Sequence, residues 1–292
     1  MGDTQITLTI AERIRSQFNN LTKSERQLAD VILKNYPISG LGSITNIAKT
    51  AVISTPTVMR MAKKLGFSGF PEFQTQLHVE LEETISNPIS KHERWAAKTS
   101  NSHILNRFTE AVMENLSQTI KQLDVETFDE VTKLLSDSKR EIYVVGGRIT
   151  HSLADYFFVH MQVMRDGLSL MNHNANVWPH NVINMQSNDL LIIFDIRRYE
   201  TDLLRLAEMA KERKVKIILF TDQWKSPVAK YAHHTFQCRI EVPSAWDSTI
   251  AITFILEALL SAVQSETWDN TKERIKTLEG LFDYIKLFEK SR

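Results

Sequence analysis

Apolar residues follow two different spacings along the chain. In the N-terminal region they recur every three or four positions, as Ile10, Ile14 and Phe18 do, which predicts short helices. Beyond residue 140 they gather into short unbroken runs separated by helical stretches. Such runs are typical of parallel strands that are buried on both faces of a sheet. The chain is therefore predicted to hold an all-α domain followed by an α/β domain.

Hydroxyl side chains mark the helix starts in the N-terminal region. Thr22 and Glu25 have the spacing of a capping box, and the helix that they begin ends at Pro37. Ser43 is placed to cap a short helix over residues 44–50. These signals are local, so they predict the boundaries of the helices without reference to the rest of the fold.

A further short helix follows a tight turn at residues 51–53. Ser54 or Thr55 caps it, and Pro56 stands in its first turn, where a missing amide hydrogen costs nothing. The helix is expected to run to residue 65. The side chains expected to face the core are Val58, Met59, Ala62 and Leu65. Those expected to face outward are Thr55, Thr57, Arg60, Lys63 and Lys64.

Two short helices joined by a tight turn are typical of a helix-turn-helix, whose second helix enters the major groove of DNA. Small polar residues there meet base edges, and basic residues meet phosphates. The predicted DNA-binding residues are Lys49, Ser54, Thr55, Thr57, Arg60, Lys63 and Lys64. Of these, Thr55, Thr57 and Arg60 are expected to approach bases, and the lysines phosphates. The alternative is a bundle helix whose polar face meets only water.

Local charge favours the DNA-binding interpretation. The whole chain carries 35 basic and 35 acidic residues, and a net charge of zero taken alone argues against nucleic acid as a partner. Residues 31–71, however, contain five basic side chains and no Asp or Glu. The zero is thus a sum over a basic segment and acid-containing regions elsewhere, so it does not count against DNA.

The second region begins with two predicted helices, over residues 104–121 and 125–136. Their expected core positions are Leu105, Phe108, Val112, Leu116, Phe128, Val131 and Leu135. The predicted strands are residues 141–147, 168–171, 189–195, 215–221 and 235–242, and the predicted helices among them are residues 152–164, 201–213, 226–232 and 248–265. This alternation predicts a doubly wound parallel sheet covered on both faces. The expected domains are residues 1–86 and 104–292, with 87–103 as a linker.

Ligands of doubly wound sheets bind beyond the carboxyl ends of the strands. The candidate loops are therefore residues 146–150, 195–200, 221–226 and 243–248. The predicted ligand-binding residues in them are Gly146, Gly147, Arg148, Thr150, Asp195, Arg197, Arg198, Glu200, Thr221, Ser226, Asp247 and Ser248.

Several motifs resemble one known family. Residues 22–26, 43–48 and 54–61, and above all the run from Leu65 to Phe73, look like the helix-turn-helix domain of RpiR/MurR-type bacterial transcriptional regulators. Residues 225–229 and 247–248 look like the sugar-isomerase (SIS) domain that follows it in that family. The resemblance implies an SIS-like α/β domain that binds a carbohydrate derivative and forms oligomers.

The ligand loops depart from the family pattern, in which a Gly-x-Gly-x-Ser loop and a Ser-x-Ser-Gly-x-Thr loop cradle the phosphate of a sugar phosphate. Here Arg148 stands in place of the second glycine, and residues 195–200 have lost the serines, the threonine and the glycine. Either Arg148, Arg197 and Arg198 converge on an anionic ligand, or they pair with nearby carboxylates or a neighbouring subunit in a degenerate site. Both readings stay open.

Several classes of protein are excluded or disfavoured. Cys238 is the single cysteine and no Cys/His spacing suits zinc, so neither a disulfide nor a metal site is expected. Gly146-Gly147 lacks the later glycine of a dinucleotide fingerprint, and no cofactor is expected. The start of the chain lacks a secretory signal, and the longest apolar runs fall short of the ~20 residues that span a bilayer. We therefore expect a cytoplasmic protein without a membrane partner.

The favoured hypothesis is a DNA-binding transcriptional regulator without enzymatic activity. It would bind operator DNA as a homodimer or homotetramer and respond to a small anionic effector, sugar-phosphate-like or a carboxylate. The alternative is a sugar-phosphate isomerase with an accessory N-terminal domain, in which Glu200 or Glu241 with a histidine supplies the base. A third hypothesis is a constitutive regulator whose second domain serves only oligomerisation.

Overall fold

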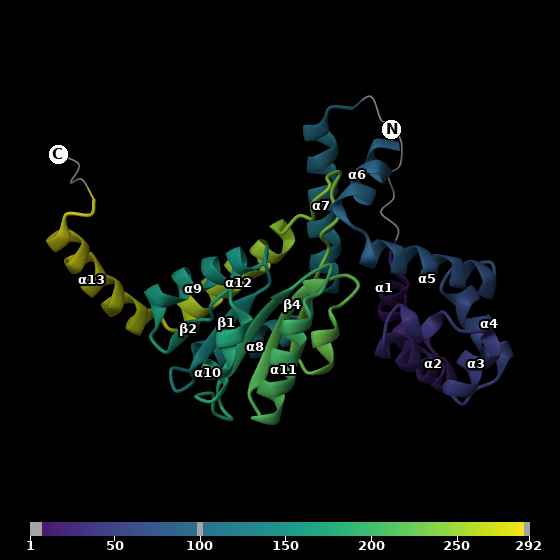
Figure 1. Cartoon of the computed structure of the whole chain (residues 1–292), viewed down its shortest axis with the longest axis horizontal. Coiled ribbons are helices and arrows are strands. Elements are labelled where there is room, and N and C mark those ends of the chain that lie inside the picture. The colour runs from purple at the N-terminus through teal and green to yellow at the C-terminus, as the bar shows by residue number, and fades with distance from the viewer. Residues whose placement is uncertain (1–7, 98–101, 289–292) are drawn as a thin grey trace. The chain divides into compact units, whose positions relative to one another are not determined.

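The computed structural model describes residues 8–97 and 102–288, and Figure 1 shows the course of the chain. The chain divides into two compact units. The first holds the chain up to Gln122 together with the loops Asp222–Pro227 and Arg239–Ser248. The second holds Leu123–Thr221, Val228–Cys238 and the chain from Thr249 onward. Two loops from the C-terminal part of the sequence therefore belong to the first unit. A single domain boundary near residue 87 does not describe this division of the chain.

The first unit begins with short helices, as the hydroxyl caps predict. They are α1 (Ile10–Ser16), α2 (Lys23–Lys34), α3 (Ile44–Thr50), α4 (Thr55–Lys64) and α5 (Phe70–Ile85), with 3-10 turns at Phe18–Asn20 and Ile38–Gly40. The capping box of Thr22 and Glu25 is confirmed, and Thr9 and Glu12 form a second one at the start of α1. Thr9, Thr22 and Ser43 cap α1, α2 and α3 through their side chains, whereas α4 and α5 begin without such a hydrogen bond.

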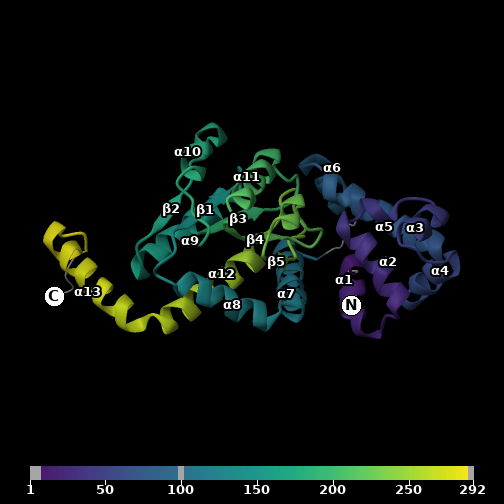
Figure 2. The same cartoon turned by 90° about the horizontal axis from the view of Figure 1, so that it is seen from below.

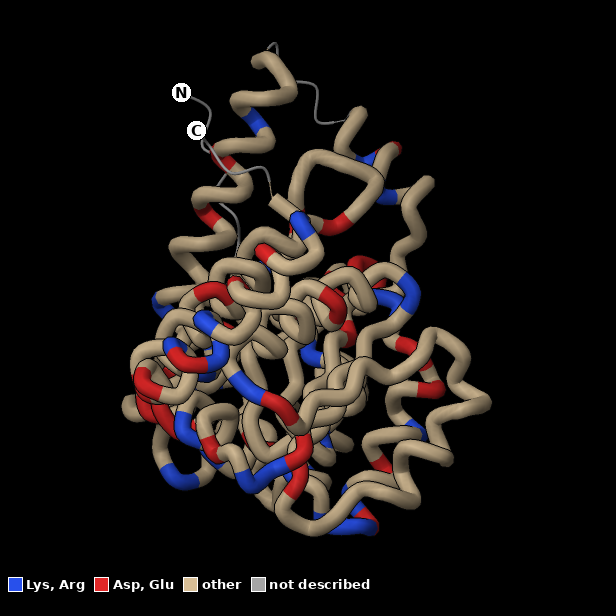
Figure 3. The backbone as a smooth tube through the Cα atoms, turned by 90° about the vertical axis from the view of Figure 1, so that its left-hand side faces the viewer, with Lys and Arg blue, Asp and Glu red and all other residues tan. Residues whose placement is uncertain are grey.

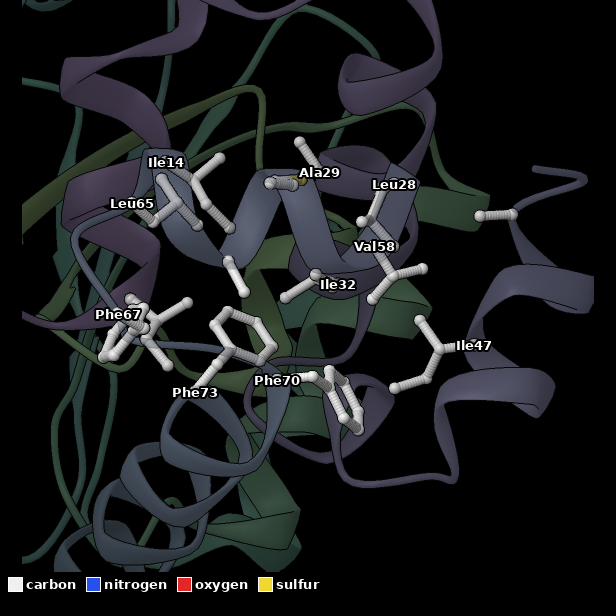
Figure 4. Close-up of a cluster of buried hydrophobic side chains, with 14 of the residues drawn as sticks. Ile14, Leu28, Ala29, Ile32, Ile47, Val58, Leu65, Phe67, Phe70 and Phe73 are labelled. Atoms are coloured by element: carbon white, nitrogen blue, oxygen red, sulfur yellow. The ribbon is translucent and has the colours of Figure 1, made fainter. Parts of the chain in front are cut away.

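A single apolar core holds these helices together (Figure 4). Ile14, Leu28 and Ile32 are buried between α1 and α2, and Leu77 of α5 is completely buried. Phe67 and Phe73 meet edge to face, with ring centroids 5.5 Å apart. The Leu-Gly-Phe run that carries the family resemblance thus supplies core residues at the junction of α4 and α5.

Two more helices complete the first unit: α6 (Pro88–Ala97) and α7 (Ile104–Gln122). The segment 87–103, predicted as a linker, therefore contains a helix. Leu105, predicted to be a core residue, is 65% exposed, whereas Asn115 and Thr119 of the same helix are buried. Asn115 Nδ2 donates to the Glu241 carbonyl at 2.8 Å, and the Arg239 N–H donates to Thr119 Oγ1 at 3.0 Å. The buried stripe of α7 is polar because it binds loop backbone, a partner that apolar periodicity does not reveal.

The second unit contains the predicted sheet. Its strands are β1 (Ile142–Gly146), β2 (Leu168–Leu170), β3 (Leu190–Asp195), β4 (Lys216–Asp222) and β5 (His234–Cys238). Their order is β2-β1-β3-β4-β5, and the β1–β2, β1–β3 and β3–β4 pairs are parallel. The predicted doubly wound fold is confirmed. From β1 the sheet is extended on one side by β2 and on the other by β3, which places the topological switch point at the carboxyl ends of β1 and β3.

Helices cover both faces of the sheet (Figure 2). The helices of this unit are α8 (Val125–Ser136), α9 (His151–Met164), α10 (Trp178–Val182), α11 (Thr201–Glu212), α12 (Ile250–Glu266) and α13 (Trp268–Ile285), with 3-10 turns at Ala175–Val177 and Pro227–Lys230. Of these, α13 packs against α9 and α12 and extends away from the sheet (Figure 1). Tyr143, Leu191 and Ile217 pack with α10 and α11. Where the sequence predicts a helix over residues 226–232, the structure has only the 3-10 turn Pro227–Lys230. The helices α10 and α13 were not predicted from the sequence. Val131 and Leu135 of α8 are buried as predicted.

One further property of the helices bears on the class of protein. No single described helix is both long and apolar enough to cross a bilayer. Only α12 and α13 taken together have the length and composition for it, and they are bent by 98° relative to each other.

Candidate nucleic-acid interface and ligand site

The turn between α3 and α4 is tight because few residues separate the two helices. The Ile53 N–H donates to the Ala48 carbonyl at 2.9 Å, which closes the chain back onto α3. Val52 adopts a left-handed backbone with φ of 54° and leaves its side chain 85% exposed. A β-branched residue rarely adopts this conformation, so the packing of α3 against α4 imposes it.

The buried face of α4 differs from the predicted one at three positions, the first of which is Met61, buried although it was not assigned to the core. Val58, Met61, Ala62 and Leu65 are buried, which is the i, i+3, i+4, i+7 stripe of one helix face. Met59, predicted to face inward, is 48% exposed. Thr57, predicted to face outward, is only 5% exposed. A residue next to Val58 lies about 100° round the helix, so Met59 cannot share its face.

Thr57 therefore organises the start of α4 instead of facing out. Its Oγ1 lies 3.0 Å from Ser54 Oγ and accepts a 3.0 Å hydrogen bond from the Arg60 guanidinium. Ser54 occupies the N-cap position, but its side chain makes no hydrogen bond to the first-turn amides. Arg60 is exposed, and the hydrogen bond to the buried Thr57 hydroxyl holds its guanidinium group against the helix.

The predicted lysines divide into two kinds. Lys49 and Lys63 are exposed. Lys64 instead binds Glu25 at 2.6 Å and the Asn20 carbonyl at 3.1 Å. Burial opposes the ionisation of Glu25, but hydrogen bonds from Lys64 and Thr22 outweigh it and lower the pKa of Glu25 below its usual value. Figure 3 shows basic and acidic residues interspersed along the chain, so the basic character of this surface is local.

The loops after β1 and β3 meet at the switch point. Gly146 at the end of β1 pairs with Phe194 of β3. A Cβ at Gly146 would lie 2.4 Å from the Thr150 carbonyl oxygen and 2.6 Å from the His151 nitrogen, so only glycine permits this close turn into α9. The structure thus brings residues 146–150 and 195–200 together, as the sequence predicts.

Hydrogen bonds inside these loops use the donors that the family pattern offers to a phosphate. The Gly147 N–H donates to Thr150 Oγ1 at 2.9 Å, and the Thr150 hydroxyl donates to the Phe194 carbonyl at 2.7 Å. The Arg148 N–H donates to Glu200 Oε1 at 2.6 Å. Glu200 in turn donates its N–H to Asp195 Oδ1 at 3.3 Å. Each of these two sets of hydrogen bonds joins residues 146–150 to the end of β3 or the loop that follows it.

The three arginines of these loops differ in exposure. Arg148 and Arg198 are exposed, and Arg197 is buried. Arg198 has a left-handed backbone with φ of 65°, which sets the course of the loop after β3. Thr221 is fully buried and lies opposite Asp195 in the sheet, so its hydroxyl stands at the end of β4.

The remaining predicted ligand residues belong to the first unit. Ser226 and Ser248 are buried, and the Ser248 N–H donates to the Ile240 carbonyl at 2.8 Å. Asp247 forms a 2.5 Å ion pair with Lys91 of α6, and both side chains are largely buried. Lys91 was missed because a single lysine in a presumed linker carries no signal in the sequence. Asp247 is thus charge-compensated from within the chain.

A second buried ion pair in the first unit was also missed. Arg239, directly after β5, is hydrogen-bonded through Nε to Glu12 Oε1 at 2.8 Å, and its terminal nitrogen binds the other carboxylate oxygen. Gln122 donates to the same carboxylate at 2.8 Å. Burial opposes the charge, but these bonds lower the pKa of Glu12 below its usual value. Partners 227 residues apart in sequence leave no local pattern.

Metal coordination finds no support in the geometry. Among residues 8–97 and 102–288, no group of three or more His, Cys, Asp or Glu side chains is placed to hold an ion. His151 and His173 stack with ring centroids 3.5 Å apart, an arrangement of ring faces rather than of converging nitrogen lone pairs. Cys238 is a buried free thiol.

The fold and these two sites define a helix-turn-helix protein with a second domain of the kind that binds small ligands at strand ends. The chain belongs to the RpiR family of transcriptional regulators: residues 8–84 match the helix-turn-helix domain of the rpiR family, and residues 134–262 match the SIS domain. The resemblance stated from the sequence motifs is confirmed.

Proteins similar to this chain are named as regulators. An uncharacterized HTH-type transcriptional regulator of Haemophilus influenzae is 26% identical over 282 residues, 94% of this chain and 96% of that protein. The regulator HexR of Escherichia coli is 25% identical over 248 residues, 82% of this chain and 80% of its own. The structure of Vibrio vulnificus NanR complexed with ManNAc-6P covers 95% of this chain and 98% of its own, with 16% identity and a TM-score of 0.56, and supports the fold.

Proposed function

We propose that this regulator binds operator DNA through α4 and is controlled by a small phosphorylated or otherwise anionic metabolite at the carboxyl ends of β1 and β3. The observation that carries the proposal is the exposed face of α4, which follows a tight turn and presents Arg60 and Lys63 to solvent. A helix with this placement inserts into the major groove and reads base edges.

The DNA-binding residues take different roles in this proposal. Thr55 and Arg60 approach base edges, and the exposed Met59 adds an apolar contact suited to a thymine methyl group. Lys49 and Lys63 bind phosphates. Ser54 and Thr57 hold Arg60 in place, and Lys64 holds α4 against α2 through Glu25.

Binding to DNA from upstream of its own gene and of neighbouring genes tests the first half of the proposal. In a fluorescence-anisotropy titration, the unmodified protein should bind one such fragment far more tightly than unrelated DNA of equal length, and the affinity should fall with salt. Arg60→Ala with Lys63→Ala should abolish this preference. The matched control is Lys133→Ala, which removes an exposed charge from α8 and should bind as the unmodified chain does. Salt-insensitive binding, or no sequence preference on any fragment, would contradict the proposal.

The effector is proposed to be a sugar phosphate or a related small anion. NanR is described in complex with ManNAc-6P, and the loops here retain Gly146, Gly147 and Thr150 beside the three arginines. A ligand that binds one conformation of the regulator better than another shifts its DNA affinity by that difference. A thermal-shift screen of sugar phosphates and small carboxylates should find a ligand that raises the melting temperature and changes operator affinity.

We propose no enzymatic activity for the chain. The Haemophilus influenzae and Escherichia coli relatives are named regulators, and the alternative of a sugar-phosphate isomerase is not favoured. The Glu200 carboxylate, one candidate base, is already bound to the Arg148 N–H. Turnover of a pentose or hexose phosphate that is abolished by Glu241→Gln would overturn this part of the proposal.

A homodimer is proposed because two recognition helices must reach half-sites about 34 Å apart. The C-terminal half of α13 offers an apolar surface: Leu281 is 56%, Tyr284 86% and Ile285 61% exposed. Apolar groups gathered on one helix are typical of a self-association surface. Light scattering should give a dimer or tetramer mass, which Tyr284→Lys with Ile285→Lys should reduce. As a regulator of DNA it is proposed to act in the cytoplasm.

A further inference from the structure

The side chain of Glu200 takes an unusual partner. Glu200 is the N-cap residue of α11, a position from which short side chains such as those of Ser, Thr, Asp and Asn accept hydrogen bonds from the first-turn amides. It makes no such bond. Its carboxylate reaches instead across the switch point to the Arg148 N–H, at 2.6 Å, just before α9 begins. The carboxylate therefore caps a neighbouring loop rather than its own helix.

The backbone beside α9 is shaped to admit this carboxylate. A Cβ placed on Gly147 would lie 2.5 Å from Glu200 Oε1 and 2.7 Å from its Cδ, so the carboxyl group packs directly on a glycine backbone. The neighbouring Gly147 N–H is occupied by Thr150 Oγ1. An anion can reach the Arg148 N–H only where Glu200 now lies. The amide donor, the glycine surface and the nearby Arg148 side chain are the features that recognise a phosphate.

From this geometry we infer that Glu200 is a tethered competitor, which occupies the phosphate position of the ligand site and must be displaced before a phosphorylated effector binds. The inference rests on the proposed ligand site between β1 and β3. Displacement is feasible because Glu200 is exposed, so its carboxylate can move into water without leaving a buried charge. Competition from the Glu200 carboxylate lowers the affinity of the site for a lone phosphate. A phosphorylated effector therefore needs further contacts from the rest of its structure to displace Glu200.

The competitor also explains why arginines replace hydroxyls here. Residues 146–150 and 195–200 carry Arg148, Arg197 and Arg198 against Asp195 and Glu200. When Glu200 leaves the Arg148 N–H and a phosphate takes its place, one anion replaces another at that amide. The positive charges that the three arginines bring to these loops favour either anion.

Inorganic phosphate is the probe for the test, since it occupies the phosphate position without needing other contacts. In calorimetric titrations of the full-length protein, Glu200→Gln should bind phosphate about tenfold more tightly than the unmodified chain. The reason is that the glutamine side chain still accepts a hydrogen bond from the Arg148 N–H but carries no charge. Glu200→Ala, which leaves the Arg148 N–H without this partner, should bind phosphate at least as tightly as Glu200→Gln. Glu212→Gln is the matched control, since it removes the same charge from the far end of α11, about 18 Å along the helix.

Hydrogen exchange at residues 147–151 supplies a second readout, which reports on the Arg148 amide itself. Exchange of the Arg148 amide should be slow in the unmodified chain, faster in Glu200→Ala, and slow again when phosphate is added to that variant. Equal phosphate affinity in all four proteins, phosphate binding by none of them, or protection that appears elsewhere would each overturn the inference. Operator binding would survive all three outcomes, so the failure of the inference is distinguishable from failure of the proposed regulator.

Discussion

The two proposed functional regions of this regulator differ in how their polar groups are paired. On α4, Arg60 and Lys63 stand in solvent, and their positive charges are open to a polyanion. In the loops after β1 and β3, the backbone donors at the switch point are hydrogen-bonded within the protein. The Gly147 N–H donates to Thr150 Oγ1, and the Arg148 N–H donates to Glu200 Oε1. A DNA-binding face can stay open because water and salt screen it until DNA arrives. A ligand site whose donors are already hydrogen-bonded within the protein binds only a ligand that replaces those hydrogen bonds.

The largest expected effect tests whether the ligand loops depend on their close backbone approach. Gly146→Ala places a methyl group 2.4 Å from the Thr150 carbonyl, so the β1–α9 turn must shift. We expect the free energy of unfolding to fall by about 3 kcal/mol, as for severe overpacking. Gly280→Ala is the control, since nothing lies within 4 Å of the added methyl group in α13, and it should gain about 0.5–1 kcal/mol. Urea unfolding followed by circular dichroism measures both, and similar midpoints for the two variants would refute the packing argument.

A buried carboxyl in the first unit provides the next comparison, because unlike Glu200 it lies away from water. Glu80 is 1% exposed and accepts hydrogen bonds from the Tyr36 hydroxyl and, at 2.9 Å, from the Ile10 N–H. Burial is the main cause that raises the pKa of Glu80 to about 7 from an ordinary value of 4.5. The folded protein therefore binds more protons than the unfolded chain between these two pH values.

The sign of the pH effect follows from that difference in bound protons. The contribution of Glu80 to stability is complete below about pH 4.5 and is lost as the pH rises through 7. The loss is up to about 3 kcal/mol. Glu80→Gln cannot ionise, so its stability relative to the unmodified chain should increase from pH 5 to pH 8. Urea midpoints at both pH values check this, and a difference that stays constant would show that Glu80 does not titrate in this range.

Sequence reasoning succeeded where structure is local. The caps at Thr22 and Ser43 and the apolar strands depend on residues a few positions apart, and each is found where predicted. It failed where a distant partner decides. Thr57 was assigned to the outer face because threonine is polar, yet it is buried. It lies four residues before the buried Met61, and residues at this spacing share one face of a helix. Because Met61 was not assigned to the core, this signal was overlooked.

The buried ion pairs of the first unit show the same limit. Lys91 with Asp247 and Glu12 with Arg239 join residues far apart in sequence, so neither pair leaves a spacing that a pattern can detect. The sequence could place Arg148 and Glu200 at the same edge of the sheet, because parallel strands end together. That Glu200 turns away from its own helix to bind the Arg148 N–H depends on a glycine surface that only the folded loops create.

The exposed guanidinium on α4 allows a test of base readout. Arg60→Lys keeps the charge but loses the planar fork that the buried Thr57 hydroxyl orients. Binding to the operator should weaken by about 10- to 100-fold, the value of one bidentate base contact. Binding to unrelated DNA should change little because the charge is retained. Anisotropy titrations on both fragments measure the ratio, and equal weakening on both would assign Arg60 to the phosphates.

The smallest expected effect separates two adjacent lysines and returns to the contrast between open and internally satisfied charges. Lys63 is exposed, whereas Lys64 is bound to Glu25 and the Asn20 carbonyl. Each lysine that binds a phosphate releases condensed counterions, so Lys63→Ala should reduce the slope of log affinity against log salt by about one. Lys64→Ala should change that slope less, because its charge is already compensated, and should lower the melting temperature more by releasing α4 from α2. Equal slopes for the two variants would show that DNA draws Lys64 away from Glu25, and the distinction between the two lysines would then hold only in the free protein.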